Sequence, residues 1–249
     1  MFKKTSLFIV ILLITLVVIS GCSKDEKETY VFASDVAWAP MEFIDENGDV
    51  VGFDIDLMAA IAEEADFEYE IRNTAWDGIF AGLANGQYDG VISSVTITED
   101  RKKAMDFSDP YINAGQVLIV RSETDGITGL DDMQGMTVGV QIGTTGDFAV
   151  EEAEGVERKT YDEIGLAVED LMNGNVEGVV CDSPVAADYV LQNENYQGEL
   201  KIVGEPFTEE YYGIAVQKDD EELLKKINAG LKAVIESGKR DELIDKWLR

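Results

Sequence analysis

The sequence contains no histidine, and this absence removes several classes of chemistry at once. Catalytic triads with a histidine base, histidine-ligated zinc sites and histidine general acid–base catalysis are all excluded. Catalysis by a carboxylate or a lysine stays open. Cysteine is almost absent too, because the 249 residues hold only Cys22 and Cys181. Cys181 lies within an apolar stretch, so we expect an inert core thiol and no intrachain disulfide.

Basic residues are also scarce, with 20 Lys and Arg against 50 Asp and Glu and a formal net charge of −30. Nucleic acid is therefore not expected as a partner, because neutralising phosphates requires clustered cations. The acids are dispersed over predicted helix faces, which favours a solvated surface, with calcium binding as the alternative. The segment 45–49 resembles the start of an EF-hand but lacks its spacing and its bidentate Glu. Its Asn47-Gly48 pair predicts a hairpin turn instead.

The N-terminus has the pattern of an export signal over residues 1–21. Lys3 and Lys4 precede an apolar run that ends at Ile19, and this run is shorter than the ~20 residues of a spanning helix. Ser-Gly directly before Cys22 resembles a bacterial lipobox, which implies that Cys22 carries palmitate. We expect a polar tether at 22–29 and a lipid-anchored chain at the cell membrane, facing the extracellular or periplasmic side. An uncleaved anchor helix is the alternative.

Two stretches of the chain, Leu83–Ser94 and Leu171–Asp182, follow the same scheme, L-x-N-G-x-x-acid-G-V. Each reads as the end of an apolar-periodic helix, an Asn-Gly stop and a short β-branched strand. Such repetition predicts two related lobes. Ligands of open α/β sheets bind beyond the carboxyl ends of the strands. We therefore expect Ser93 and Ser94 to face Asp182 across a cleft that suits a small zwitterion.

Strand and helix patterns alternate along the chain, which predicts an α/β fold with mostly parallel sheets and helices on both faces. Strands are expected at 30–34, 41–44, 50–53, 67–72, 90–93, 116–120, 137–140, 178–181, 200–203 and 213–217. Helices are expected at 55–65 (with Asp54 as N-cap), 76–85, 98–105, 145–154, 164–173, 184–192 and 221–237, with a shorter one ending at Leu248. Hinge crossings near 114–118 and 205–209 would divide the chain into lobe 1, residues 30–113 plus 208–249, and lobe 2, residues 114–207. The last helices would pack on lobe 1.

Arg101 is the most informative cation. It follows the predicted cap Thr98 by three residues, where a positive charge opposes the helix dipole. Beside the amides of Ser94 and Thr96, its guanidinium is suited to a bidentate carboxylate. A salt bridge with a neighbouring acid, Glu99 or Asp100, explains the position equally well.

Other candidates lie where predicted strands end. Thr144 and Thr145 begin a helix whose free N–H groups suit an anion. Trp38 and Trp76 could clamp the flat or aliphatic part of a ligand, or simply pack in the core. Asp35 could pair with a ligand side chain or cap a turn.

Four stretches together resemble the polar amino acid substrate-binding proteins of bacterial ABC importers, the extracellular solute-binding protein family 3. The stretches are Ala33–Phe43, Gly52–Leu57, Ser93–Arg101 and Phe107–Tyr111. The likeness covers about residues 30 to 248. It implies a two-lobed, periplasmic-binding-protein-like fold with the ligand cleft between the lobes.

The resemblance also implies roles for residues in the cleft. Arg101 would bind the α-carboxylate of an amino acid, helped by groups at Ser94, Thr96 and Thr145. Asp182 would bind the α-ammonium. The remaining positions would surround the side chain: Trp38 and Trp76 as a sandwich, Asp35 at its polar end, and Gln141 as a selector.

These expectations define a function. The chain would capture a polar or basic L-amino acid, arginine-, lysine/histidine- or glutamine-like, and deliver it to the transmembrane subunits of an ABC permease. It would be a monomer with no catalytic residue, cofactor or metal. Met41 stands where many relatives have Phe, which affects pocket size. The alternatives are a cyclohexadienyl dehydratase-like enzyme on the same fold and the ligand-binding module of a sensor.

Overall fold

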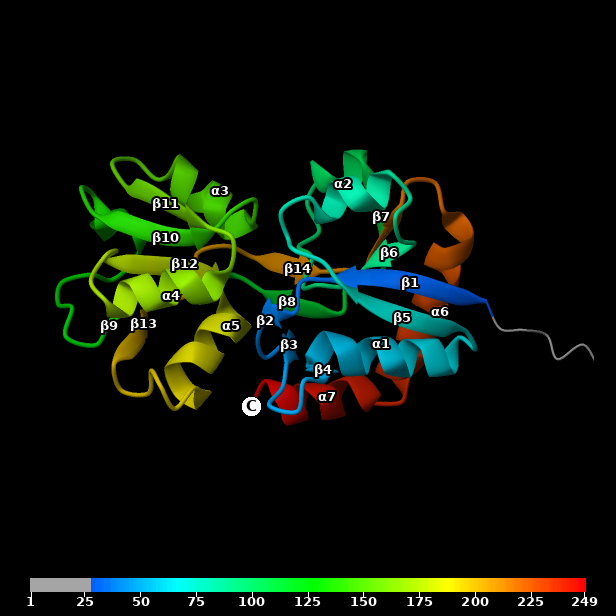
Figure 1. The fold of residues 1–249 in the computed structure, drawn as a ribbon. Helices are drawn as coiled ribbons and strands as arrows, with labels where there is room; N and C mark the ends of the chain where they lie inside the picture. Colours follow the sequence, from blue (N-terminus) through cyan, green and yellow to red (C-terminus); the bar gives the residue numbers. More distant parts are fainter. Residues whose placement is uncertain (1–27) are drawn as a thin grey trace, which may run out of the picture.

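A computed structural model describes residues 28–249 and arranges them as two lobes beside one another (Figure 1). Each lobe contains a five-stranded sheet with helices packed on it. The predicted α/β, two-lobed fold is thereby confirmed. The export signal, Cys22 and nearly all of the tether lie outside the described residues. Among residues 28–249, no helix has the length and apolar character needed to cross a membrane.

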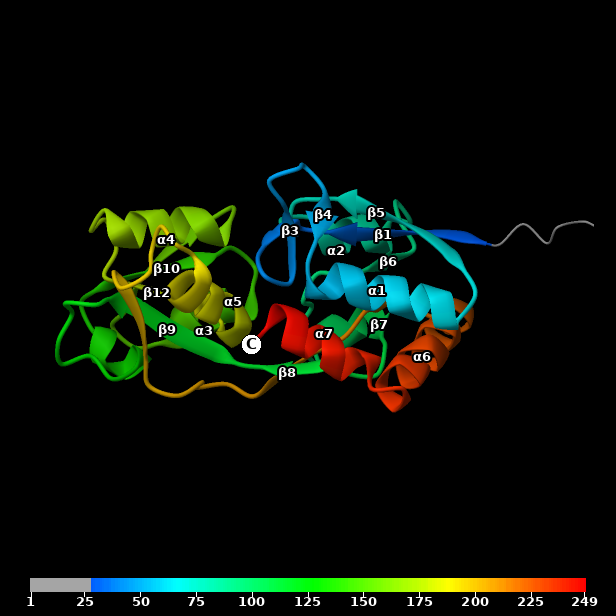
Figure 2. The same cartoon turned by 90° about the horizontal axis from the view of Figure 1, so that it is seen from below.

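The sheet of lobe 1 has the strand order β5-β1-β6-β15-β7. Its strands are β1 (Thr29–Ser34), β5 (Glu68–Asn73), β6 (Gly90–Val91), β7 (Met105–Phe107) and β15 (Ala215–Gln217). The strands β5, β1 and β6 are parallel, and β15 pairs antiparallel with both of its neighbours. The helix α2 (Ile79–Ala84) covers one face. The other face carries α1 (Phe53–Glu64), α6 (Glu221–Glu236) and α7 (Lys239–Trp247), which lie side by side in Figure 2. The C-terminal helices thus pack on lobe 1, as predicted.

The sheet of lobe 2 repeats this plan with the order β11-β10-β12-β9-β13. Its strands are β9 (Gln116–Arg121), β10 (Thr137–Gln141), β11 (Glu157–Tyr161), β12 (Gly178–Asp182) and β13 (Leu200–Val203). Here β11, β10 and β12 are parallel, and β9 is antiparallel to β12 and β13. The helix α3 (Thr145–Glu152) lies on one face, and α4 (Ile164–Met172) and α5 (Ser183–Ala187) lie on the other (Figure 1).

Two short antiparallel strands, β8 (Ile112–Ala114) and β14 (Glu210–Tyr212), lie between the lobes and connect them (Figure 1). Lobe 1 also carries a small meander of β2 (Ala37–Trp38), β3 (Glu42–Ile44) and β4 (Val50–Val51). The turn between β3 and β4 contains Gly48 at φ 87°. This left-handed conformation costs glycine little, and the Asn-Gly hairpin prediction is confirmed.

Several sequence-based expectations were wrong. The helix expected at 98–105 is one 3₁₀ turn, Arg101–Lys103, because the next residues form β7 and pair with β15. Asp54 does not cap α1: the cap position is Gly52, and Asp54 is fully buried within the first turn. The strand β11 was missed because it is a polar, largely exposed edge strand. The helix expected at 184–192 divides into α5 and a π-helical turn.

Candidate ligand-binding cleft

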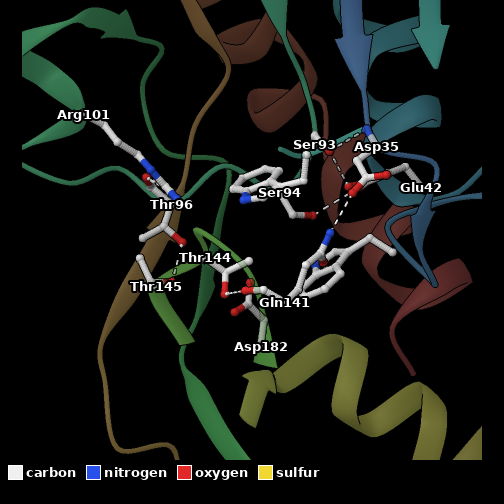
Figure 3. Close-up of a pocket in the computed structure, with 12 residues that line it drawn as sticks. Asp35, Glu42, Ser93, Ser94, Thr96, Arg101, Gln141, Thr144, Thr145 and Asp182 are labelled. Atoms are coloured by element: carbon white, nitrogen blue, oxygen red, sulfur yellow. Dashed lines mark hydrogen bonds between the residues drawn. The ribbon is translucent and has the colours of Figure 1, made fainter. Parts of the chain in front are cut away.

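A pocket with about 320 Å³ of atom-free space lies between the two lobes (Figure 3). It gathers all eleven residues selected from the sequence and one that was not, Glu42. Lobe 1 contributes Asp35, Trp38, Glu42, Trp76, Ser93, Ser94, Thr96 and Arg101. Lobe 2 contributes Gln141, Thr144, Thr145 and Asp182. The eight positions from lobe 1 follow or belong to β1, β2, β3, β5 and β6, and those from lobe 2 follow or end β10 and β12. The pocket therefore lies at the strand tips, where α/β sheets bind ligands.

The Arg101 guanidinium lies in the pocket, where it contacts two aromatic rings and two backbone carbonyl oxygens. Its Nη1 donates to the carbonyl oxygen of Thr96 at 2.8 Å, and its Nη2 donates to that of Gly143 in lobe 2 at 3.4 Å. Its central carbon is 5.4 Å from the ring centroid of Trp76 and 4.9 Å from that of Phe80. Burial lowers the pKa of Arg101 to about 10, so the group stays charged at neutral pH.

The alternative reading of Arg101 as half of a local salt bridge fails. Its acidic neighbours pair elsewhere, Glu99 with Lys102 and Asp100 with Lys103. Within residues 28–249, Arg101 forms no ion pair within 4.0 Å. A half-buried cation whose partners are neutral retains unused capacity to bind an anion.

Asp182 carries the opposite charge from the end of β12 and is 5% exposed. Its carboxylate accepts hydrogen bonds from Nε2 of Gln116 and from the hydroxyl of Tyr212. Burial raises the pKa of Asp182 to about 7, the charge of Glu210 adds to the rise, and the charge of Arg101 opposes it. Like Arg101, it forms no ion pair within the described chain. An ammonium group beside Asp182 would favour the ionised form.

A direct bond joins the lobes at another side of the pocket. Gln141 donates from Nε2 to Oδ2 of Asp35 at 2.8 Å, and the same nitrogen lies 3.0 Å from the carbonyl oxygen of Asp162. The Asp35 amide in turn donates to Oγ of Ser93 at 3.0 Å. Burial raises the pKa of the Asp35 carboxyl. A cation or amide from a ligand side chain would meet Asp35 and Gln141 as a pair.

Trp38 and Trp76 each line the pocket and also pack in an apolar cluster, so the core reading is confirmed and the ligand-clamp reading stays a prediction. Trp76 meets Phe80 edge-on, with ring centroids 5.0 Å apart. Such packing restrains a ring that a ligand can then use as a wall.

The N-terminus of α3 closes the lobe 2 side. Thr144 is the N-cap: its hydroxyl oxygen accepts from the amide of Asp147 at 3.1 Å and donates to the carbonyl oxygen of Gln141 at 2.8 Å. Thr145 is the first residue of the helix. The first amides of a helix lack intrahelical partners and favour negative charge.

This geometry agrees with the comparisons with known proteins. The model of the bacterial extracellular solute-binding proteins, family 3, matches residues 30–249. The chain belongs to this family. A probable histidine-binding protein of Neisseria gonorrhoeae is 41% identical over 224 residues, which span 88% of this chain and 83% of that relative. Among solved structures, an ancestral arginine-binding protein bound to arginine is 42% identical, with a TM-score of 0.85, and covers 90% of this chain and 100% of its own. The ancestral amino acid-binding protein AncCDT-1, a precursor of cyclohexadienyl dehydratase, is 37% identical, with a TM-score of 0.82 over 89% and 96% of the two chains.

Among the residues that line the pocket of this family 3 protein, sequence reasoning missed Glu42. It is fully buried, and its carboxyl oxygens accept from Oγ of Ser93 at 2.9 Å and from Oγ of Ser94 at 3.3 Å. Asp54 lies behind it and accepts from the Ser94 amide at 2.7 Å and from the hydroxyl of Tyr111 at 2.8 Å. Burial raises the pKa of Glu42 well above its usual value and that of Asp54 to about 6.

These two acids fix the serine tip of lobe 1. Ser94 adopts φ 49°, a conformation that is uncommon outside glycine. Its amide and hydroxyl are both held by the acids, which compensates for that strain. The available signal was an acid within the short strand pattern Met41-Glu42-Phe43, where an apolar residue is usual.

Proposed function

We propose that this chain is a lipid-anchored substrate-binding protein that captures a polar or basic L-amino acid and delivers it to the permease of an ABC importer. One observation carries the proposal. Arg101 from lobe 1, which is half-buried, and Asp182 from lobe 2, which is buried, line one pocket, and neither has an ion-pair partner in residues 28–249. An α-amino acid provides the complementary carboxylate and ammonium on one carbon atom.

The proposed ligand roles follow the charges. Arg101 binds the α-carboxylate, with the first amides of α3 as further donors. Asp182 binds the α-ammonium. Trp38 and Trp76 flank the side chain, and Asp35 with Gln141 receives its polar end. Support for a basic or polar ligand comes from buried Asp35 and from the histidine- and arginine-binding relatives. The lipid anchor rests on the sequence around Cys22.

Isothermal titration calorimetry of the chain against the twenty amino acids tests this function. We expect micromolar or tighter binding of one or a few basic or polar L-amino acids, without turnover. Asp35→Ala should lower the affinity for basic or polar amino acids far more than the affinity for aliphatic ones, because only a basic or polar side chain bonds to the Asp35 carboxylate. Equal losses for all ligands would refute the role of Asp35.

A cyclohexadienyl dehydratase-like enzyme is the second candidate, favoured by the likeness to AncCDT-1. Such an enzyme requires a proton donor aimed into the cleft. Glu42 and Asp182 both line the pocket, and burial raises the pKa of both, to about 7 for Asp182, so either carboxyl could serve. Incubation with prephenate or arogenate separates the candidates, because their consumption would replace the transport assignment.

A further inference from the structure

Glu210 lies on β14, one of the two strands between the lobes, and was not among the residues selected from the sequence (Figure 1). It is 8% exposed. Its carboxylate lies next to the cleft, in contact with Thr96 and Thr145 of the pocket lining.

A single oxygen of Glu210 binds both lobes. Oε2 accepts a hydrogen bond from Oγ1 of Thr96 at 2.7 Å, in lobe 1, and another from Oγ1 of Thr145 at 2.7 Å, in lobe 2. The two hydroxyl oxygens are 3.5 Å apart and lie next to each other in the pocket (Figure 3). The other oxygen, Oε1, accepts from Oγ1 of Thr208 at 2.8 Å. Thr208 in turn accepts from the amide of Gln116 at 2.8 Å, so Glu210 is itself held by the crossing segments.

The proton inventory of these hydroxyls limits what they can do for a ligand. A threonine hydroxyl has one proton and two lone pairs. Thr96 and Thr145 both give that proton to Glu210, and Thr145 also accepts from Nε2 of Gln116 at 3.1 Å. The lone pairs that remain can accept a hydrogen bond from an ammonium group. Neither hydroxyl has a proton left to donate to a carboxylate. Donors to a carboxylate are then Arg101 and backbone amides.

The same arrangement couples Glu210 to closure. Hydrogen bonds to a carboxylate are among the stronger ones in proteins. One oxygen can hold Thr96 and Thr145 together only while the lobes are in contact, so opening the cleft breaks at least one of these bonds. We propose that Glu210 is a positioning residue that latches the closed cleft and turns both threonine hydroxyls into acceptors. This inference rests on the proposed function for its ligand and extends it to a residue outside the pocket lining.

Stopped-flow binding of L-arginine and L-histidine, followed by tryptophan fluorescence, tests the latch. Glu210→Ala should raise the dissociation rate about tenfold and change the association rate less than twofold, because a ligand enters the open cleft, in which the latch is already broken. Glu210→Gln keeps an oxygen that can accept hydrogen bonds from both threonines. Its dissociation rate should therefore lie between those of Glu210→Ala and the unmodified chain. The matched control is Glu209→Ala, an exposed neighbour that accepts from the hydroxyl of Tyr211 and should behave as the unmodified chain.

A double-mutant cycle separates the latch from a general loss of structure. In the presence of Thr96→Val, Glu210→Ala should change the dissociation rate much less than it does alone, because half of the bridge is already gone. Additive effects, or an unchanged dissociation rate in Glu210→Ala, would overturn the proposal.

Hydrogen–deuterium exchange without added amino acid keeps this test apart from the transport assignment. Segment 141–148 should exchange faster in Glu210→Ala than in Glu209→Ala if the latch holds the lobes. If the unmodified chain binds neither amino acid, the proposed transport function is wrong. The exchange rates of Glu210→Ala and Glu209→Ala then test the latch by themselves, and equal rates would reject the latch.

Discussion

The two lobes share a scaffold and differ in the charge at its tip. In lobe 1, β6 lies parallel to β1 with Gly90 opposite Phe32, and in lobe 2, β12 lies parallel to β10 with Gly178 opposite Val138. Each of these strands is next paired with an antiparallel strand, β15 or β9. The repeated L-x-N-G-x-x-acid-G-V sequence therefore marks equivalent places in two sheets.

Beyond these glycines the lobes diverge. The chain of lobe 1 leaves β6 after Val91, turns at Ser94 with φ 49°, and brings Arg101 to the cleft. The strand of lobe 2 continues to Asp182, which enters the cleft directly. The repeat thus marks the two strand tips that face the pocket, and the residues after it set the charge on each side. A cation from one lobe and an acid from the other suit a ligand that carries both charges.

Removing the cation of lobe 1 is the strongest way to break this comparison. Arg101→Ala should lower the affinity for every α-amino acid by at least about a hundredfold, because hydrogen bonds to charged groups contribute roughly 1.5–3 kcal/mol each and two are lost. Arg101→Lys should recover little, since a lysine lacks the planar fork. Calorimetric titration measures both.

The control for this change is Lys102→Ala. Lys102 is the next residue, is half exposed and pairs with Glu99, so its loss should leave affinity unaltered. If Arg101→Ala lowers the affinity for only some amino acids, Arg101 binds the side chain of the ligand and not the α-carboxylate that all amino acids share.

The acid of lobe 2 should give a smaller, pH-dependent effect. The pKa of Asp182 is raised to about 7, and a bound ammonium favours the ionised carboxylate. Protons then compete with the ligand below pH 7, so affinity should rise by up to about tenfold per pH unit toward pH 7 and level off above it.

Asp182→Asn should bind more weakly and flatten this profile, because the amide does not titrate in this range. Titrations at pH 5.5, 6.5 and 7.5 suffice. Affinity that increases on acidification would contradict the assignment of Asp182 to an ammonium group.

How much of this could be predicted from the sequence depended on whether local patterns agreed with tertiary structure. Gln141 was selected only through the family resemblance, whereas the repeat and the apolar periodicity predicted two α/β lobes and the strand-tip rule placed Ser93, Ser94 and Asp182 in one cleft. These features are local or follow from sheet topology. The ligand roles of the eleven residues stay predictions until they are tested by binding.

The errors arose where a distant segment decided the outcome. The Oγ1 of Thr98 accepts from the amide of Arg101 at 3.1 Å, as a cap would, but Met105–Phe107 pairs with β15 and leaves only a 3₁₀ turn at Arg101–Lys103. Asp is a common N-cap residue, but the carboxylate of Asp54 instead accepts hydrogen bonds from the amide of Ser94 and the hydroxyl of Tyr111. Glu210 looked like one acid in a polar stretch, and only the approach of both lobes shows its contacts.

The smallest expected effect concerns the acids behind the serine tip of lobe 1. Burial raises the folded-state pKa of Glu42, so below its unfolded value near 4.5 both states are protonated and no stability is lost. As pH rises through that value the unfolded state ionises while buried Glu42 keeps its proton, and stability falls until the folded-state pKa is passed. Glu42→Gln removes this titration, so its stability relative to the unmodified chain should be greater at pH 7.5 than at pH 4.5. Urea unfolding at both values measures the difference, and parallel changes in the two proteins would mean that Glu42 is ionised in the folded cleft and that the serine tip faces a charge.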